Sequence, residues 1–262
     1  MEQRIYQVDA FTDKIFSGNP AAVCPLDYWL DDDVLQKIAI ENNLAETAFY
    51  VNKNDIYQIR WFTPVTEVDL CGHATLASAY VLFNYENHQD DVVKFYSPRS
   101  GNLEVIRKNE LLTLNFPTDK FDKIEINESM KSAFNIKPKH VYRGKTDFLF
   151  VFENENDIKT IVPDLRVISL LGGRGTIVTG RGDDVDFVSR FFAPQSGIDE
   201  DPVTGSAHTT LTPYWSKELS KKKLSSVQLS KRCGYLSCED LGDRVEISGQ
   251  CRLYMKGNIY VK

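Results

Sequence analysis

Short stretches of alternating hydrophobic and polar residues run through the first half of the chain. Residues 4–11 place Tyr6, Val8 and Ala10 on one face, and this period of two predicts a β-strand. Similar apolar runs predict further strands at residues 21–24, 47–51, 57–62, 92–96, 103–106 and 111–116. The last three lie close together and are typical of a strand meander.

Helical periodicity interrupts these strands. Leu76, Tyr80 and Phe83 fall on one stripe behind Gly72, and this spacing predicts a helix that begins at the glycine. A second helix is predicted after the acidic residues 31–33, which suit a helix N-terminus. The second half shows the same order, with weak helical character at 158–165, a helix from Gly205, and strands at 176–179, 187–192, 227–230, 235–238 and 245–248.

The two halves also share sequence. Residues 60–64 (RWFTP) parallel residues 190–194 (RFFAP), 130 positions later. Residues 97–103 parallel residues 230–236, and Gly72 parallels Gly205, both 133 positions later. One repeat of half the chain length indicates a duplicated domain rather than a solenoid. The polar run after Phe116-Pro117 places the boundary between residues 1–118 and 119–262.

Composition narrows the class of protein. The chain has 262 residues, 42% of them hydrophobic, and a net charge of −6, which fits a folded globular protein and disfavours a general nucleic-acid binder. No apolar run reaches the roughly 20 residues of a membrane span, and the N-terminus has no signal-peptide pattern. The five cysteines include no C-x-x-C pair, so we expect free thiols and a cytoplasmic location.

Each half has a glycine at a predicted helix start, followed by a polar side chain. His73 follows Gly72, and Ser206 follows Gly205. The first amides of a helix lack intrahelical acceptors and lie at its positive end, so two such ends would suit a carboxylate ligand. The alternative is that both glycines serve only to start their helices.

Other readings of these residues are weaker. Asp201, Ser206 and His208 lie within eight residues, whereas the members of a hydrolase triad normally converge from separate segments. No H-x-x-x-H spacing is present, so we expect no metal site. The segment 172–175 (GGRG) matches no phosphate-binding motif and is interpreted as a turn before a strand.

Four motifs together resemble the PhzF-like family of phenazine-biosynthesis-like proteins. They are residues 9–23, 45–49 (AETAF), 69–77 (DLCGHATLA) and 200–208 (EDPVTGSAH). The resemblance implies the α/β (α+β) fold of diaminopimelate epimerase, in which two pseudo-symmetric domains each wrap a curved, mostly antiparallel sheet or barrel around a central helix. It also implies an active site in the cleft between the domains, a homodimer, and a last strand at 258–262 that can join the first domain.

The resemblance further implies a chemistry. The chain would be a cofactor-independent isomerase of a small carboxylate similar to trans-2,3-dihydro-3-hydroxyanthranilate. Its catalytic residues would be Glu46, which takes and returns the proton, with Asp201 and His73 orienting the substrate. Substrate binding would fall to Gly72, Gly205 and Ser206. A carboxylate among apolar neighbours, such as Glu46 between Ala45 and Ala48, suits proton transfer near neutral pH.

Two alternatives stay open. The resemblance implies that epimerase relatives of the same fold use one cysteine from each half, but here Cys71 occupies the first position and Thr204, which cannot form a thiolate, occupies the second. With an offset of 130, Glu46 maps onto Thr176, so the second half supplies no second carboxylate. The other alternative is a non-catalytic ligand-binding or interaction protein that kept the fold.

Overall fold

The computed structural model describes residues 2–261, and its chain forms two compact units. Unit 1 comprises Met1–Asn115 and Ser248–Lys262, and unit 2 comprises Phe116–Ile247. The sequence pattern placed this division at 118/119 and the returning segment at 258–262. The chain passes from one unit to the other within β8 (Leu111–Pro117) and back within β16 (Arg244–Gly249).

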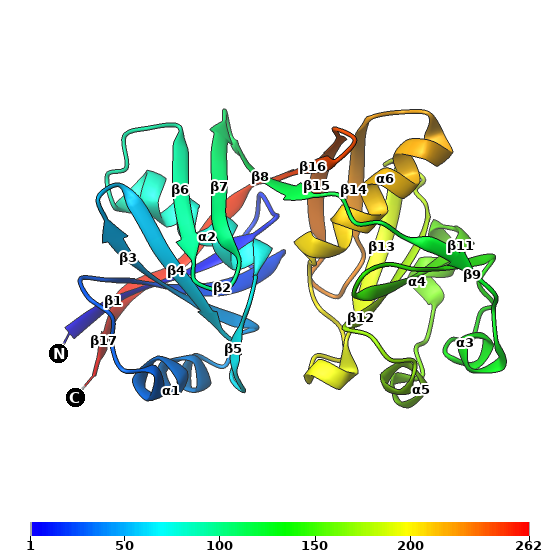
Figure 1. The fold of residues 1–262 in the computed structure, drawn as a ribbon, viewed down its shortest axis with the longest axis horizontal. Helices are drawn as coiled ribbons and strands as arrows, with labels where there is room; N and C mark the ends of the chain where they lie inside the picture. The colour runs from blue at the N-terminus through cyan, green and yellow to red at the C-terminus, as the bar shows by residue number, and fades with distance from the viewer. Residues whose placement is uncertain (1, 262) are drawn as a thin grey trace. The chain divides into compact units, whose positions relative to one another are not determined.

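Unit 1 is a mixed, mostly antiparallel sheet around one helix (Figure 1). Its strands are β1 (Glu2–Ala10), β2 (Asn19–Leu26), β3 (Glu46–Lys53), β4 (Ile56–Phe62), β5 (Glu67–Val68), β6 (Val92–Ser97), β7 (Gly101–Lys108) and β17 (Cys251–Tyr260), together with β8. Strand β1 pairs antiparallel with β2 and with β17, whereas β2 with β3 and β4 with β6 pair in parallel.

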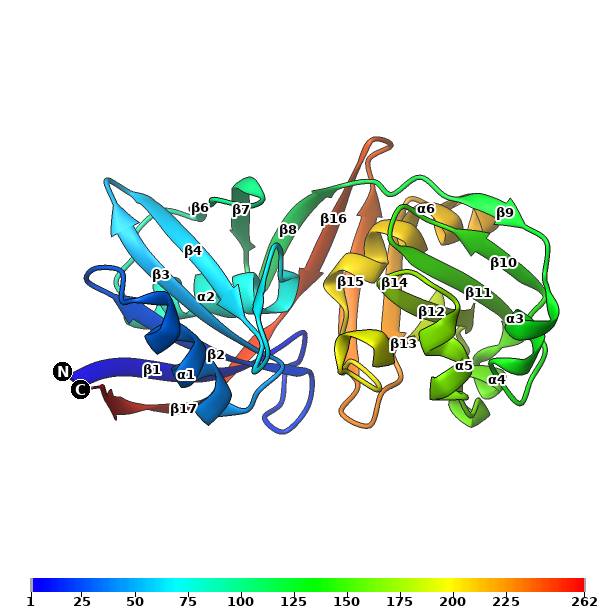
Figure 2. The same cartoon turned by 60° about the horizontal axis from the view of Figure 1, so that its bottom comes forward.

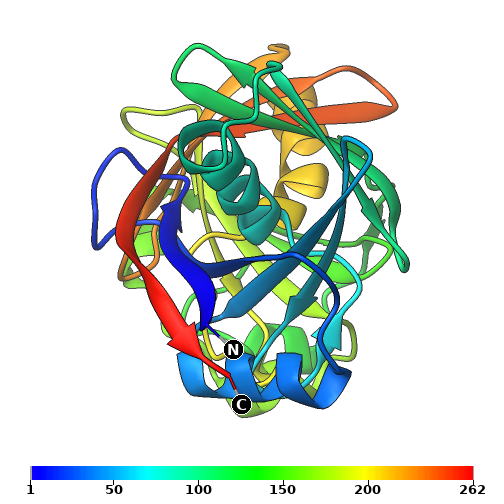
Figure 3. The ribbon, with the colours of Figure 1, turned by 90° about the vertical axis from the view of Figure 1, so that its left-hand side faces the viewer.

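The helix α2 (Gly72–Tyr85) lies inside the curve of these strands (Figure 3). Ten of its 14 residues are buried, so the predicted stripe of Leu76, Tyr80 and Phe83 is wider in the structure than the spacing indicated. The hydroxyls of Thr75 and Ser78 donate to carbonyls one turn back, which satisfies polar groups inside the core. Helix α1 (Asp32–Asn42) covers the other face of the sheet through Leu35, Ile38 and Ala39.

Unit 2 has the same plan (Figure 2). Its strands are β9 (Asp122–Ile124), β10 (His140–Arg143), β11 (Asp147–Asn154), β12 (Gly175–Arg181), β13 (Phe187–Phe192), β14 (Lys223–Gln228) and β15 (Gly234–Asp240), together with β16. Its helices are α3 (Glu128–Ser132), α4 (Glu155–Thr160), α5 (Leu165–Leu170) and α6 (His208–Leu219), and the 3-10 turns are η1 (Pro194–Ser196) and η2 (Gly205–Ala207). An aromatic-rich core that includes Phe134, Phe150 and Phe192 fills it.

The central helix of unit 2 is α6, which continues from η2 and contains Pro213. A proline inside a helix removes the N–H that would bond to the carbonyl four residues earlier, here that of Thr209. The backbone N–H of Asp119 donates to this carbonyl at 3.2 Å. The freed carbonyl is therefore satisfied, and the helix continues through the proline.

The strand pairings show the duplication directly. In each unit, five successive strand pairs alternate between antiparallel and parallel, and the first pair is antiparallel. In unit 1 these pairs are β1/β2, β2/β3, β3/β4, β4/β6 and β6/β7. In unit 2 they are β10/β11, β11/β12, β12/β13, β13/β14 and β14/β15. Arg60 binds Glu67 and lies 5.1 Å from the ring centre of Phe62. Its counterpart Arg190 binds Glu200 and lies 5.0 Å from that of Phe192. The predicted α/β fold class is confirmed.

Local differences from the sequence prediction have physical causes. The segment 158–165 is not one helix, because α4 ends at Thr160 and the chain at Pro163 forms an isolated β-bridge with Phe134 before α5. The strand predicted at 227–230 ends at Gln228, and Ser230 Oγ then accepts from the N–H of Cys233 in a turn. Strands β10 and β11 were missing from the prediction. Within residues 2–261 no helix has the length and apolarity needed to span a membrane.

Candidate active site

In unit 1 the structure brings two of the expected catalytic residues into contact. Glu46 is the first residue of β3, and His73 is the second residue of α2. His73 Nε2 lies 3.3 Å from Glu46 Oε2, and the two side chains are 6% and 13% exposed. The contact is long for a hydrogen bond, and its alignment leaves Nε2 without a regular hydrogen-bond acceptor.

The other side of the His73 ring faces two further residues. Asn19, which starts β2, places Nδ2 at 3.3 Å from Nδ1, and Cys71 Sγ lies 3.4 Å from the same nitrogen. With the Asn19 amide in this orientation, Nδ2 is the donor and Nδ1 the acceptor, which assigns the ring proton to Nε2, toward Glu46. Asn19 belongs to one of the family-like motifs but was not among the predicted site residues.

Burial decides the charge of this histidine. Removal from water lowers the pKa of His73 to about 3, so the ring is neutral at neutral pH. The contact with Glu46 is therefore one between a neutral N–H and a carboxyl group, rather than an ion pair. The neutral histidine therefore adds no positive charge beside the Glu46 carboxyl.

Within residues 2–261 one group of side chains has the composition of a metal site. Donor atoms of Glu46, Cys71 and His73 lie within 4.8 Å of one another. However, Glu46 lies at Nε2 and Cys71 lies at Nδ1, on different edges of the imidazole ring. An ion bound at Nε2 would lie away from Cys71, and an ion bound at Nδ1 would lie away from Glu46. The geometry therefore favours a hydrogen-bonded cluster over a metal centre.

Unit 2 holds the remaining predicted residues. Gly205 and Ser206 form the 3-10 turn η2, and Asp201 lies on the loop before it. Thr204 donates its hydroxyl to Asp201 Oδ2, and Gln228 Nε2 donates to the Asp201 carbonyl at 2.8 Å. The loop that carries Asp201 is thus fixed to β14. Thr204 serves here as a hydrogen-bond donor at the position where a thiol relative would have its second cysteine.

His208 has a structural role. Its Nδ1 lies 3.0 Å from the Thr204 carbonyl, and its Nε2 lies 3.2 Å from Ser226 Oγ. Burial lowers the pKa of His208 to about 4, so it too is neutral at neutral pH. Since both ring nitrogens are engaged by neighbours, a hydrolase triad with Ser206 is not formed.

The sequence analysis missed Arg174. The segment 172–175 is a turn before β12, as expected, but its arginine donates from Nη1 to Ser206 Oγ at 3.0 Å. Two other nitrogens of the guanidinium bind Asp147. The signal in the sequence was an arginine in a glycine-rich turn, which by itself does not reveal a partner 32 positions away.

The strand register corrects one correspondence between the halves. Thr47 pairs with Phe62, and Thr176 pairs with Phe192. Since Phe62 and Phe192 are counterparts, Glu46 corresponds to Gly175 and not to Thr176. Gly175 has no side chain, and the Phe191 ring occupies the place that a Cβ atom would take, so this position supplies no carboxylate.

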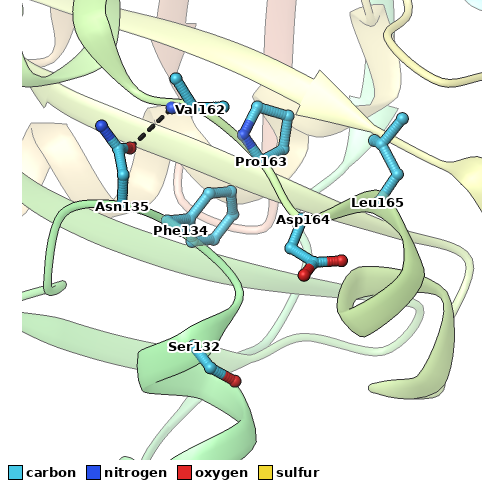
Figure 4. A pocket seen from close by; sticks show the side chains of 7 residues that line it. All are labelled: Ser132, Phe134, Asn135, Val162, Pro163, Asp164 and Leu165. Atoms are coloured by element: carbon cyan, nitrogen blue, oxygen red, sulfur yellow. Dashed lines mark hydrogen bonds between the residues drawn. The ribbon is translucent and has the colours of Figure 1, made fainter.

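A shallow surface depression lies elsewhere in unit 2 (Figure 4). Its lining includes Phe134, Asn135 and Asp164 but none of the predicted site residues. Asp164 caps α5 by accepting from the N–H of Val167, and Asn135 Oδ1 accepts from Val162 N–H at 2.7 Å. These polar groups are committed to local structure, so we place no chemistry there.

Comparison with known proteins first identifies the fold. The chain is similar in fold to a hydroxyproline epimerase from Agrobacterium vitis, with a TM-score of 0.61, 10% identity, and coverage of 98% of this chain and 92% of that chain. At this identity the likeness shows the shared epimerase-type fold alone.

The family follows from closer matches. The model of the PhzC-PhzF family, "Phenazine biosynthesis-like protein", matches residues 8–257, and the chain belongs to this family. An uncharacterized isomerase of Pseudomonas aeruginosa is 48% identical over 261 residues, covering 100% of both chains. A crystal structure of a PhzF family protein from Enterococcus faecalis is 47% identical, with a TM-score of 0.97 and full coverage of both chains.

Proposed function

We propose that this protein is a cofactor-independent isomerase of a small carboxylate similar to trans-2,3-dihydro-3-hydroxyanthranilate. Glu46 takes a proton from an acidic carbon of the substrate and returns it to another carbon as the double bond moves. The carboxylate gains one proton and then loses it, so the cycle balances without an oxidant or reductant.

The difference between the two units is the observation that carries this proposal. In unit 1 a carboxyl group lies beside a neutral, buried histidine, 3.3 Å away. In unit 2 the counterpart of Glu46 is Gly175, and the counterpart of Cys71 is Thr204, whose hydroxyl is donated to Asp201. One acid–base group fits removal and return of a proton by the same residue better than it fits a pair of opposed thiols.

The remaining roles follow the family resemblance. His73 and Asp201 hydrogen-bond to the substrate and orient or polarise it. Ser206 and the amides of Gly72 and Gly205 bind the anionic end. Amides in the first turn of a helix have no intrahelical acceptor and are suited to a carboxylate.

Deuterium exchange tests the proposal. The wild-type protein is incubated in D₂O with dihydro-hydroxyanthranilate and a panel of small carboxylates, and carbon-bound deuterium is followed by NMR. We expect deuterium to enter at the carbon that receives the proton, together with double-bond migration. Glu46→Gln should lower the rate on the order of 10²–10⁴-fold, whereas the exposed Glu41→Gln on α1 serves as control and should not.

Two outcomes would contradict it. Exchange at a stereocentre without movement of a double bond would replace the isomerase by an epimerase. An exchange rate unchanged by Glu46→Gln would remove Glu46 as the proton carrier. A folded protein that binds the acids but exchanges no proton with any of them would favour a non-catalytic binding protein.

A cytoplasmic homodimer with the small carboxylate as its only partner completes the proposal. It rests on the family resemblance and on the five cysteines, none of which forms a disulfide in the described part of the chain. Sedimentation velocity tests the oligomeric state: a monomer at micromolar concentration would contradict it.

A further inference from the structure

The guanidinium of Arg174 is held in a fixed orientation. Asp147, the first residue of β11, accepts from Arg174 Nε at 3.0 Å and from Nη2 with its other oxygen. The Asp147 side chain is only 4% exposed, whereas that of Arg174 is 42% exposed. This two-point ion pair aims the third nitrogen, Nη1, at Ser206 Oγ, 3.0 Å away.

The duplication places this contact at a corresponding point of the fold. Thr75 Oγ1 donates to the Cys71 carbonyl, and His208 Nδ1 bonds to the Thr204 carbonyl, four residues back in each case. Cys71 and Thr204 are therefore counterparts, as are His73 and Ser206. The contact between Arg174 and Ser206 in unit 2 thus involves the counterpart of His73, and Arg174 lies one residue before Gly175, the counterpart of Glu46.

In both units a charged side chain at the start of a strand reaches the residue that follows the helix-start glycine. Glu46 opens β3, and Arg174 directly precedes β12. The charge is negative in unit 1 and positive in unit 2. In unit 1 the charged side chain that contacts His73 is the proposed proton carrier, so the charged side chain that contacts Ser206 in unit 2 is a candidate for a residue that acts on the ligand.

The chemistry of the contact indicates what Arg174 does. A guanidinium has donors only, so Ser206 Oγ must be the acceptor in this bond. A serine hydroxyl has a single proton, which is then left to donate to another group. Partial burial acts to lower the pKa of Arg174, but the hydrogen bonds and charge of Asp147, with the charges of Asp201 and Asp119, raise it overall. The guanidinium stays charged, and the nearby carboxylates offset its long-range attraction for anions.

We propose that Arg174 is a positioning residue that fixes Ser206 as a hydrogen-bond donor toward the carboxylate of a ligand. The proposal rests on the proposed function, which assigns the anionic end of the substrate to Ser206. It adds a residue that sets the affinity for carboxylates through the orientation of one hydroxyl, and it predicts that neutral analogues gain nothing from Arg174.

The test is a double-mutant cycle in binding, which needs no turnover. Dissociation constants for anthranilate and for its neutral analogue anthranilamide are measured by NMR titration of the full chain. The proteins are the wild type, Arg174→Gln, Arg174→Lys, Ser206→Ala and the double variant Arg174→Gln/Ser206→Ala. Arg143→Gln is the matched control, because Arg143 contacts the same turn through the Gly172 carbonyl at 3.1 Å.

We expect Arg174→Gln to weaken anthranilate binding about 3–10-fold, the range of one oriented hydrogen bond, and to leave anthranilamide unchanged. The double variant should bind no more weakly than Ser206→Ala alone, because the effect of Arg174 passes through the serine. Arg174→Lys should recover part of the affinity, and Arg143→Gln should match the wild type. Thermal unfolding of each variant identifies any that fail to fold, and Arg174→Lys then carries the cycle.

Several results would overturn the proposal. They are unchanged anthranilate affinity in Arg174→Gln, additive losses in the double variant, equal weakening of both analogues, or no binding of anthranilate to the wild type at 10 mM. The proposed isomerase fails separately: coupling between Arg174 and Ser206 without any carbon-bound exchange would refute the isomerase and support this proposal. Carbon-bound exchange that depends on Glu46, without coupling between Arg174 and Ser206, would support the isomerase and refute the role proposed for Arg174.

Discussion

The charge of His73 makes a prediction that can be worked out in numbers. Burial lowers its folded-state pKa to about 3, against an ordinary value of 6.5. The unfolded chain therefore binds a proton at this histidine below pH 6.5, whereas the folded protein does not. The sign follows: the contribution of His73 to stability is fully present above pH 6.5 and is lost progressively as the pH falls from 6.5 toward 3.

From pH 7.5 to pH 5.5 the unfolded histidine goes from about one-tenth to about nine-tenths protonated, and the stability of the folded state falls by about 1.4 kcal/mol. Urea unfolding at the two pH values measures this loss. His73→Gln removes the titrating group, so its stability should fall by about 1.4 kcal/mol less than that of the wild type. His140→Gln, which replaces a partly exposed histidine, serves as control and should follow the wild type.

The reasoning is refuted if wild type and His73→Gln lose the same stability over this range. That result would mean that the folded protein protonates His73 near its ordinary pKa, with the Glu46 carboxylate outweighing burial. The pair would then be a true ion pair, and a carboxylate so stabilised would be a weaker base than the proposed isomerase requires.

Two further substitutions test the frame of the site. Asn19→Ala removes the donor at His73 Nδ1 and should lower the free energy of unfolding in urea by about 1–3 kcal/mol. Asn19→Asp should move the ring proton to Nδ1, which the ¹⁵N shifts of the imidazole report. An unchanged tautomer in Asn19→Asp would show that Asn19 does not set it. Gly18→Ala places a Cβ against the Ala10 carbonyl oxygen at φ +66° and should destabilise by more than about 1 kcal/mol, and unaltered thermal unfolding would contradict that strain.

Much of the fold could be predicted from the sequence because its strands alternate. Within residues 4–11 the alternating residues Tyr6, Val8 and Ala10 predicted a strand, and all three are buried in β1. Strand β11 was not predicted, because its residues from Asp147 to Phe152 are all buried. Residues 148–152 are therefore a continuous apolar run without the alternation that marks a half-buried strand. Helix α2 was predicted from the stripe of Leu76, Tyr80 and Phe83, although ten of its 14 residues are buried and its buried surface is wider than that stripe.

Some residues of the candidate site could be predicted from the sequence, and others could not. Glu46, His73, Asp201 and Ser206 were found because they occur in contiguous motifs. Arg174 was not found, because its partners Asp147 and Ser206 lie 27 and 32 positions away, and only the strand pairing brings them together. The correspondence of Glu46 with Gly175 also needed the register, since a shift of one residue between two β-strands cannot be read from an offset between motifs.

The pairing of β1 with β17 has a consequence for how the protein is made. Nine residues of β1, from Glu2 to Ala10, pair with a strand that begins at Cys251. A ribosome therefore releases the first strand long before it synthesises the last one, while the whole of Phe116–Ile247 emerges in between as one continuous piece. Until the final residues leave the exit tunnel, one edge of β1 stays open, and an open edge readily accepts a strand from another chain. We expect nascent chains stalled before residue 251 to depend on chaperones, whereas chains that include β17 close this edge by pairing it with β1.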